Sequence, residues 1–273
     1  MELCAIVLAA GEGRRLRPLT GLRPKALCPV GNVALLDQAL SRVAGLGLAG
    51  PARVAVNACY LAEQVVAHVG ERATVSVEPG SPLGTSGGVA NLRGWIDGRA
   101  VLAGNSDAYL AGAELAPLLA GWDGETVRLL AVRADDPARA EFGKRRFAGF
   151  SLLPWPLVEP LPVKPSELVH TVWRPAEAAG RLEVVEYFGT FFDTGTPPDY
   201  LAANLHAADG GNLVAPGAEV TGRLAGAVVG SGAVVAGALT RAVVWPGGYV
   251  GPDEHLVDAV RVGQDLTVHA ALA

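Results

Sequence analysis

Hydrophobic and polar positions change their spacing along the first part of the chain in a way that predicts strands and helices in turn. Residues 3–9 (LCAIVLA) form a continuous apolar run, which is typical of a parallel strand buried on both faces. A helix is predicted over residues 33–43 with Asn32 as its cap, because apolar residues recur there at helical spacing. The same reasoning predicts strands over residues 53–57, 74–78 and 100–104 and helices over residues 61–69 and 88–96. This alternation indicates a three-layer, Rossmann-like α/β fold with a mostly parallel sheet.

Polar or glycine-rich loops follow three of these strands. The first strand runs into a loop with two glycines, the strand over residues 74–78 into the turn SPLGTSGG, and the strand over residues 100–104 into Asn-Ser-Asp. In open α/β sheets, ligands bind outside the carboxyl ends of the strands. We therefore expect the three loops to meet in one crevice.

Residues 211–273 differ from the rest in their repetition of small and aliphatic residues. The aliphatic positions are separated by six residues, apart from two steps of nine, and fall at Val214, Val220, Val229, Val235, Val244, Val250, Leu256, Val262 and Val268. A six-residue period predicts a short left-handed parallel β-helix, whereas ordinary β-hairpins would repeat every two residues. We predict a catalytic domain over residues 1–210 and a β-helix over 211–273 that could join copies of the chain into a homo-oligomer.

Composition restricts the classes of partner. The chain has 273 residues, 50% of them hydrophobic, and no apolar run reaches the roughly 18–20 residues of a membrane span. The amino terminus has no basic leader, and the three cysteines form no Cys-x-x-Cys motif, so we expect a cytoplasmic protein without a membrane partner. A net charge of −5 with no extended basic stripe argues against nucleic acid.

One short segment departs from this acidic balance. Residues 8–31 read LAAGEGRRLRPLTGLRPKALCPVG and contain five basic side chains, Arg14, Arg15, Arg17, Arg23 and Lys25. Gly11 and Gly13 could adopt positive φ and let backbone N–H groups approach an anion. The segment is not a Walker A loop, because the pattern GxxxxGK followed by Ser or Thr is absent, and it is not a dinucleotide-binding fingerprint, because Leu16 occupies the third glycine position. The basic cluster predicts a local anionic ligand such as a phosphate.

This segment resembles the signature loop of the sugar-1-phosphate nucleotidyltransferases, LAAGxGTRLxPLT followed by PKPLxPV. Four further segments resemble the family in the same order: VNACYLAEQV, EPGSPLGTSGGV, LAGNSDAYL and GTFFDTGTPPDYLAANL. The hexad tail also occurs in this family, so the resemblance covers essentially the whole chain. It implies transfer of a nucleotidyl group from an NTP to a sugar-1-phosphate, with release of pyrophosphate and with Mg²⁺ as cofactor.

The resemblance also implies roles for individual residues. Arg15 and Lys25 would contact the transferring phosphates, as a guanidinium fork and an ammonium point charge do elsewhere. Asp107 and Asp193 would hold Mg²⁺, for which carboxylate oxygens are suitable ligands, and Asp107 counts among the catalytic residues with Arg15 and Lys25. The residues expected to bind the nucleotide are Leu8, Ala10, Gly11, Gly13, Arg14, Asn57, Glu78, Gly84 and Thr85.

The part of the predicted site that binds the nucleotide and the metal, which we call the nucleotide half, departs from the family pattern at two positions. The threonine that follows GxG in the family is Arg14 here, which is either a further clamp on the triphosphate or a solvated side chain. The glycine of the family's Gly-Asp motif is Ser106. The carboxylate of Asp107 is kept, but the glycine that leaves room beside it is not.

The part of the predicted site that contacts the sugar phosphate, which we call the sugar half, departs further from the family pattern. Phe-Ala-Gly at residues 147–149 stands where the family has Asn-Ala-Gly, and Glu141 with Lys144 could replace the usual Glu-Lys pair at a different spacing. We therefore expect Lys144 and Gly149 to contact the sugar phosphate, and Trp155 could border the sugar pocket. The nucleotide half looks intact and the sugar half altered.

Three hypotheses for function remain open at this stage. The first is an active sugar-1-phosphate nucleotidyltransferase. The turn PLGTSGG is slightly more similar to guanylyl-transferring members, so GTP with a mannose- or heptose-type sugar phosphate is favoured. The altered sugar half also allows a non-catalytic regulatory subunit that binds a nucleotide or nucleotide-sugar. An acyltransferase that uses the hexad tail is the third, with His255 and His269 as its only histidines.

Overall fold

The computed structural model describes residues 2–271, which form two compact units. The first unit comprises the chain up to Glu12, Pro24–Ala26 and Leu36–Phe191. The second comprises Gly13–Arg23, Leu27–Leu35 and the chain from Phe192 onward. This division differs from the predicted boundary at residue 210, because the second unit includes two amino-terminal segments and a helix that precedes the repeat.

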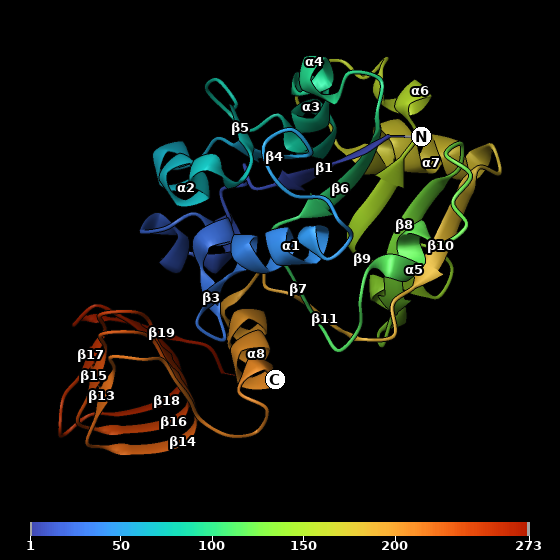
Figure 1. Cartoon of the computed structure of the whole chain (residues 1–273). Coiled ribbons are helices and arrows are strands. Elements are labelled where there is room, and N and C mark those ends of the chain that lie inside the picture. The colour runs from blue at the N-terminus through green and yellow to red at the C-terminus, as the bar shows by residue number, and fades with distance from the viewer. Residues whose placement is uncertain (1, 272–273) are drawn as a thin grey trace. The chain divides into compact units, whose positions relative to one another are not determined.

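A seven-stranded sheet in the order β10-β8-β9-β6-β1-β4-β5 forms the centre of the first unit (Figure 1). Its strands are β1 (Leu3–Leu8), β4 (Val54–Ala58), β5 (Thr74–Val77), β6 (Ala100–Asn105), β8 (Val127–Arg133), β9 (Arg145–Leu153) and β10 (Leu182–Glu186). Only β9 runs antiparallel to its neighbours, β6 and β8. The other neighbouring pairs are parallel, so the predicted mostly parallel sheet is confirmed.

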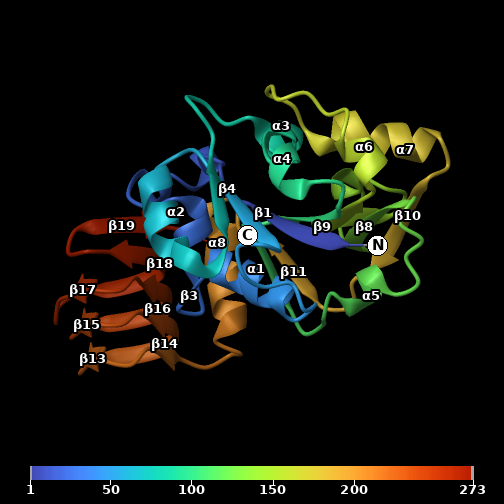
Figure 2. The ribbon, with the colours of Figure 1, turned by 45° about the horizontal axis from the view of Figure 1, so that its top comes forward.

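Helices cover both faces of this sheet, as the three-layer prediction requires. Figures 1 and 2 show α3 and α6 on one side of the sheet and α1 and α5 on the other. The helices are α1 (Leu35–Ala44), α2 (Ala62–Val69), α3 (Gly84–Asn91), α4 (Arg93–Ile96), α5 (Ala116–Leu119), α6 (Trp155–Val158) and α7 (Arg174–Ala178), the last preceded by a π-helical turn over Val169–Trp173. The core between sheet and helices includes Ile6, Val89 and Leu129, all fully buried. This core fixes the strand ends that carry the predicted site.

Two helix boundaries differ from the sequence prediction. Asn32 does not cap a helix: it has φ 65° in the turn between β2 (Pro29–Val30) and β3 (Val33–Ala34), a conformation that asparagine tolerates better than most residues. The helix predicted over 88–96 begins at Gly84 and divides into α3 and α4. The GTSGG segment is therefore the first part of a helix.

The second unit is organised around α8 (Pro197–Ala207). Thr196 caps the helix by accepting a hydrogen bond from the backbone of Asp199. The fully buried Tyr200 donates its hydroxyl to the Pro29 carbonyl and accepts a bond from Trp245 Nε1 at 3.0 Å. Because Tyr200 contacts both Pro29 and the repeat, the segment around β2 belongs with the carboxyl-terminal part of the chain.

The repeat region forms two parallel ladders. One contains β12 (Leu213–Val214), β14 (Arg223–Val229), β16 (Ala238–Val244) and β18 (His255–Val262), with β19 (Leu266–His269) antiparallel at its end; the other contains β13 (Glu219–Val220), β15 (Val234–Val235) and β17 (Tyr249–Val250). Val214 pairs with Val229, which pairs with Val244, so these equivalent positions lie 15 residues apart, and the next step, from Val244 to Arg261, spans 17 residues.

The two nine-residue steps of the sequence pattern have a structural explanation. Each contains a further strand segment that ends at a left-handed bend, with φ 65° at Gly226 and φ 46° at Arg241. Each of the two 15-residue repeats therefore contains three short strand segments, rather than segments spaced evenly by six residues. The left-handed winding and the role in assembly remain predictions.

The described residues include no helix that is long and apolar enough to cross a membrane. Cys4, Cys28 and Cys59 are free thiols. Burial raises the pKa of Cys4 to about 11, which fits its predicted place in a buried strand. The remaining short elements are β7 (Ala108–Ala111), β11 (Thr190–Asp193) and 3₁₀ turns at Arg14–Leu16, Leu19–Gly21, Lys25–Leu27, Gly70–Arg72 and Pro137–Arg139.

Candidate active site

A buried hydrogen-bond network joins the carboxyl ends of three neighbouring strands. The backbone N–H of Ala9, after β1, donates to Asn57 Oδ1 at 2.7 Å. Asn57 Nδ2, in β4, donates to Glu78 Oε1 at 2.7 Å, and Glu78 Oε2 accepts from the Leu83 N–H at 2.7 Å. Asn57 and Glu78 are 2% and 3% exposed. These predicted nucleotide-binding residues fix the strand ends, and direct contact with a nucleotide remains a prediction.

Hydrogen bonds also attach the carboxyl end of β6 to the carboxyl end of β1. Both the backbone N–H and the hydroxyl of Ser106 donate to the Leu8 carbonyl, at 3.1 and 2.7 Å. Ser106, which stands where the family pattern has glycine, thus ties the residue after β6 to the end of β1. As predicted, the loops after these strands meet at one edge of the sheet, and Asp107 lies there.

Lys25 and Asp107 form an ion pair at this edge. Lys25 Nζ donates to Asp107 Oδ2 at 2.8 Å. The Lys25 side chain is only 9% exposed, whereas that of Asp107 is 38% exposed. A buried ammonium requires an anionic partner, because desolvation without one is costly. The carboxylate remains accessible to a ligand, so the pair combines a fixed cation with a reachable anion.

Arg15, predicted as a phosphate contact, and Asp193, predicted as a metal ligand, lie together in the second unit. Arg15 Nη2 is 3.8 Å from Asp193 Oδ2, with side chains 69% and 31% exposed. Exposed ion pairs contribute about 0–1 kcal/mol, so this pair could exchange for a ligand at little cost. An added Cβ at Gly195 would lie 2.7 Å from Arg15 Nη2, so the Arg15 guanidinium lies against the Gly195 backbone.

The predicted metal ligands, Asp107 and Asp193, belong to different units, each with the cation of its own unit. Among residues 2–271, no group of three or more His, Cys, Asp or Glu side chains is placed to hold a metal ion. Joint coordination of Mg²⁺ by the two aspartates remains a prediction.

The glycines of the first loop differ in conformation. Gly13 has φ 61° at the start of a 3₁₀ turn, as expected, but Gly11 is not among the residues with positive φ. An added Cβ at Gly11 would meet nothing within 4 Å, so its backbone is open to a ligand. Ala10 is buried and Arg14 is exposed. Their contacts with a nucleotide remain predictions.

Gly84 and Thr85 are held by residues that the sequence did not single out. Gly84 has φ 71°, and a Cβ there would lie 2.5 Å from the Ser166 carbonyl oxygen. Glu167 Oε2 accepts from the Thr85 hydroxyl at 2.7 Å and from its N–H at 3.1 Å. The Thr85 hydroxyl in turn accepts from the Leu168 N–H at 2.8 Å. Residues 166–168 therefore fix the start of α3.

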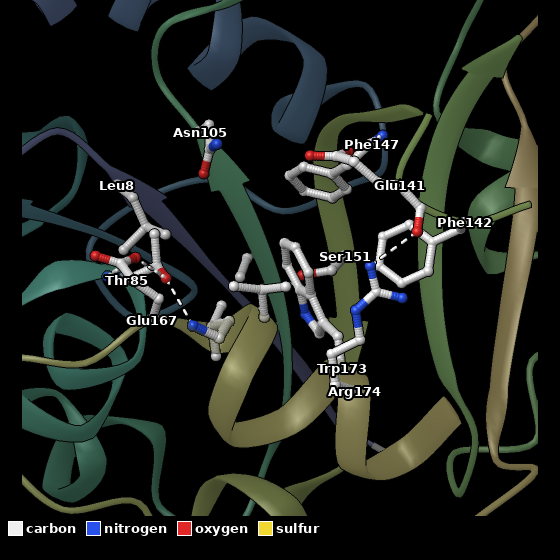
Figure 3. Close-up of a pocket in the computed structure, with 13 residues that line it drawn as sticks. Leu8, Thr85, Asn105, Glu141, Phe142, Phe147, Ser151, Glu167, Trp173 and Arg174 are labelled. Atoms are coloured by element: carbon white, nitrogen blue, oxygen red, sulfur yellow. Dashed lines mark hydrogen bonds between the residues drawn. The ribbon is translucent and has the colours of Figure 1, made fainter. Parts of the chain in front are cut away.

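A cavity of about 240 Å³ opens beside Leu8 and Thr85 in the first unit (Figure 3). We call it the aromatic cavity, and it is lined by Leu8, Thr85, Ala103, Asn105, Glu141, Phe142, Phe147, Ser151, Glu167, Leu168, Val169, Trp173 and Arg174. Figure 3 shows Leu8, Thr85 and Glu167 on one side and the aromatic side chains with Arg174 on the other. The cavity thus adjoins the strand ends described above.

Only part of the predicted sugar half reaches this cavity. Glu141 lines it, and its Oε2 accepts from the Phe147 N–H at 2.7 Å. Lys144 is exposed in the turn before β9 and is not among the lining residues, so the structure does not bring it to the cavity. Gly149 has φ 89°, and an added Cβ would lie 2.4 Å from Ala108 Cβ. Trp155 packs against the core and does not border the cavity.

The aromatic wall was missed by sequence reasoning. The rings of Phe147 and Trp173 have centroids 4.5 Å apart, and those of Phe142 and Trp173 are 6.4 Å apart in an edge-to-face arrangement. The Arg174 guanidinium lies 4.4 Å from the Phe142 ring centroid. Trp173 has no predicted role in the site, because nothing in its local spacing indicates that β9 and the π-helical turn converge.

Cys59 lies directly after β4, beside the buried network. Burial raises its thiol pKa above the usual 9.0, and the charges of Glu78 and Glu12 raise it further. The thiol therefore responds to the charge of Glu78, which makes it a local probe of the strand ends.

Comparison with known proteins follows the same division of the chain. The model of the MobA-like NTP transferase domain family matches residues 5–184, which lie mainly in the first unit. A mannose-1-phosphate guanylyltransferase from Mycobacterium tuberculosis is 34% identical over 43% of this chain and 33% of its own length. An N-acetylmuramate α-1-phosphate uridylyltransferase from Caulobacter vibrioides is 36% identical over 44% of this chain and 53% of its own length. The chain therefore aligns with a third to about half of these relatives.

A solved structure shows the same fold. It is a crystal structure of a Bacillus anthracis protein, provisionally described as a glucose-1-phosphate thymidylyltransferase, in complex with a sucrose. The match has a TM-score of 0.67 at 19% identity and covers 76% of this chain and 96% of that chain. At this identity the likeness supports the fold, and the residues above must support any activity.

Proposed function

The chain belongs to the family of MobA-like NTP transferase domains, and from this premise we propose that it is a sugar-1-phosphate nucleotidyltransferase. The proposed reaction joins a nucleotidyl group from an NTP to a sugar-1-phosphate and releases pyrophosphate. The relatives from Mycobacterium and Caulobacter support this class of reaction, because both are named as enzymes that transfer a nucleotidyl group to a sugar phosphate.

The observation that carries the proposal is the Lys25–Asp107 pair at the carboxyl end of β6. Phosphoryl and nucleotidyl transfer need little covalent help from a protein, and depend on positioning and on stabilisation of charge. A buried ammonium can neutralise phosphate oxygens, and an accessible carboxylate beside it can hold a divalent cation. The two charges required by the reaction are therefore already adjacent.

The bonds balance without an additional reactant. A phosphate oxygen of the sugar-1-phosphate forms a bond to the α-phosphorus of the NTP. The bond from that phosphorus to the oxygen bridging to the β-phosphate breaks, and its electron pair leaves with pyrophosphate. Lys25 Nζ would contact the transferring phosphate, and the backbone around Gly11 is open for the same anion.

We propose Mg²⁺ as the cofactor and Asp107 as one of its ligands. The carboxylate fits this role because oxygen ligands suit Mg²⁺ and because the side chain is 38% exposed. When bound, the cation would neutralise charge on the phosphates. Asp193 as a second ligand and Arg15 as a phosphate contact are proposed by resemblance.

The proposal also names a donor nucleotide and a class of acceptor sugar. The turn PLGTSGG and the mycobacterial relative favour GTP with a mannose- or heptose-type acceptor. The relative from Caulobacter is named as a uridylyltransferase, so UTP is the competing donor. A homo-oligomer formed through the repeat region remains a further proposal, which the mass of the protein in solution tests.

Pyrophosphate release with Mg²⁺ tests the proposal, over GTP, UTP, dTTP, ATP and CTP against a panel of sugar-1-phosphates. In the productive combination, Asp107→Asn should lower kcat by about 10²-fold or more, because it removes a charged contact to the transferring group. Asp97→Asn is the matched control: Asp97 is exposed at φ 48°, which asparagine tolerates. Full activity of Asp107→Asn would overturn the metal assignment.

Lys144 supplies the observation that favours a second candidate function. Its absence from the aromatic cavity leaves the predicted sugar half incomplete, as in a subunit that binds nucleotide without turnover. Nucleotide binding without pyrophosphate release from any acceptor would favour this regulatory role. Failure to bind any nucleotide would overturn both functions.

A further inference from the structure

The aromatic cavity contains two buried polar atoms that its own protein surroundings do not satisfy. Trp173 Nε1 and Ser151 Oγ have no hydrogen-bond partner among the described residues, and the two residues are 8% and 1% exposed. The third such atom in the described chain, Arg93 Nε, belongs to α4 and not to this cavity. Buried polar groups are nearly always paired, so two unpaired groups at one cavity point to a ligand.

The chemistry of these two atoms is complementary. The indole N–H of Trp173 only donates, whereas the hydroxyl of Ser151 donates or accepts. A fitting ligand group therefore offers an acceptor to Trp173 and either kind of partner to Ser151. A planar amide, which has a carbonyl oxygen and an N–H, meets both demands.

The cavity wall adds an apolar requirement. Phe142, Phe147 and Trp173 form one contiguous aromatic surface, and Leu168 and Val169 lie among the other lining residues. A hydroxyl placed against these rings would lose water without gaining an equivalent partner. A methyl group would gain from the same burial, so the favoured group combines an amide with a small alkyl end.

The size of the cavity limits what it can contain. Its volume of about 240 Å³ is below the range of roughly 300–1,000 Å³ that is usual for sites of drug-sized ligands. It suits a substituted monosaccharide better than a complete nucleotide. Leu8 and Asn105 at its border come from the ends of β1 and β6, where the transferring phosphate is proposed to lie.

We propose that the aromatic cavity selects the acceptor and that it takes an acylamino substituent on the sugar ring of the sugar-1-phosphate. Trp173 donates to the carbonyl oxygen of this substituent, Ser151 pairs with its N–H or its oxygen, and the acyl methyl contacts the rings of Phe142 and Phe147. This inference rests on the proposed function. It favours an acylamino sugar over the fully hydroxylated mannose or heptose predicted from the sequence.

Two acceptors that differ only at one ring carbon test this proposal. Pyrophosphate release by the full chain is measured with N-acetylglucosamine-1-phosphate and with glucose-1-phosphate, each with GTP and with UTP. The acylamino acceptor should have the higher kcat/KM by about 10²-fold, because a site built for hydrogen bonds rejects a ligand that lacks them. Equal kcat/KM for the two acceptors would overturn the proposal.

Two variants assign the preference to the cavity. Trp173→Phe and Ser151→Ala should each reduce the preference for the acylamino acceptor by about tenfold, because each removes one hydrogen bond to the substituent. Trp122→Phe is the matched control: its indole N–H already donates to the Thr126 carbonyl, and it does not line the cavity. An equal loss with both acceptors, or a loss confined to the KM for the NTP, would overturn the assignment.

Binding separates this proposal from the proposed function. Quenching of tryptophan fluorescence by N-acetylglucosamine-1-phosphate is compared between the wild type and Trp173→Phe. Trp173-dependent quenching without turnover would keep the cavity assignment and overturn the enzyme. Turnover that does not discriminate between the acceptors would keep the enzyme and overturn the cavity assignment. Absence of this binding together with absence of turnover of every sugar-1-phosphate in the panel would overturn both.

Discussion

The first unit contains two neighbouring buried polar regions that are built in opposite ways. At the strand ends, Asn57 and Glu78 are almost fully buried, and each has protein partners at 2.7 Å. In the aromatic cavity, Ser151 and Trp173 are similarly buried, and each has a polar atom without a protein partner. Both regions adjoin Leu8 or the residue after it.

The difference separates residues that shape a site from residues that meet a ligand. In the satisfied network, each oxygen and nitrogen of the Asn57 and Glu78 side chains has a protein partner, so the network serves to fix the backbone. An unsatisfied pair has a cost in the free protein that a suitable ligand removes. Substitution should therefore lower stability in the first region and change specificity in the second.

The largest effect on stability is expected for Asn57→Ala. The substitution removes the acceptor of the Ala9 N–H and the donor to the Glu78 carboxylate. Leaving these buried groups unpaired should lower the free energy of unfolding by about 3 kcal/mol, or about 6–12 °C in Tm. Differential scanning calorimetry of the full chain measures the change.

Ser151→Ala provides the contrast to that variant. Its hydroxyl is as deeply buried but has no protein partner, so its removal should leave Tm within about 2 °C of the wild type. If Asn57→Ala and Ser151→Ala lower Tm equally, the distinction between the two regions fails.

A smaller loss is expected when a methyl group is placed inside the satisfied network. A Cβ at Gly88 of α3 would lie 2.5 Å from Asn57 Nδ2 and 2.8 Å from Glu78 Oε1. Gly88→Ala should therefore cost about 1–3 kcal/mol through strain in the packed surroundings. Urea unfolding measures this cost as a lower midpoint.

Gly94→Ala is the matched control for this overpacking. Gly94 lies in α4, and an added Cβ there meets nothing within 4 Å. Since alanine has the higher helix propensity, Gly94→Ala should be neutral or stabilising by up to about 1 kcal/mol. Similar midpoints for the two variants would show that the space beside Asn57 adjusts freely.

These two regions also mark how far the sequence predicts the site. The sequence predicts the strand ends well because their residues follow apolar runs whose carboxyl ends must meet at one sheet edge, as Asn57, Glu78 and Asp107 illustrate. It does not predict the aromatic cavity, because Ser151 and Trp173 belong to a strand and a π-helical turn whose convergence depends on tertiary packing. Lys144 was predicted by resemblance, as a replacement for the family's Glu-Lys pair at a different spacing, and it lies in the turn before β9 and outside the cavity lining.

The fold shows the same limit. The mostly parallel sheet is readable from periodicity, but the antiparallel β9 has no distinct local pattern. In the repeat, the sequence identifies the period. It does not reveal the positive φ values at Gly226 and Arg241, which bend the chain within the two nine-residue steps. Asn32 was predicted as a helix cap, and the pairing of β2 with β3 overrides that local preference.

The smallest predicted effect uses Cys59 to report on the charge within the satisfied network. The raised thiol pKa means that little thiolate is present at pH 8, so alkylation should be slow and should accelerate as the pH rises through and above 9. Glu78→Gln removes one of the charges that raise this pKa, and should therefore increase the alkylation rate at pH 8 by about two- to threefold.

Controls separate this electrostatic effect from a change in exposure. Glu63→Gln alters an exposed side chain on α2 that does not contribute to the raised pKa, so it should leave the rate unchanged. Cys59→Ser should abolish the rapid phase, since Cys4 and Cys28 are buried. If Glu78→Gln increases the maximal rate at high pH instead of shifting the pH profile downward, the variant has opened the strand ends. The network would then act on Cys59 through packing and not through charge.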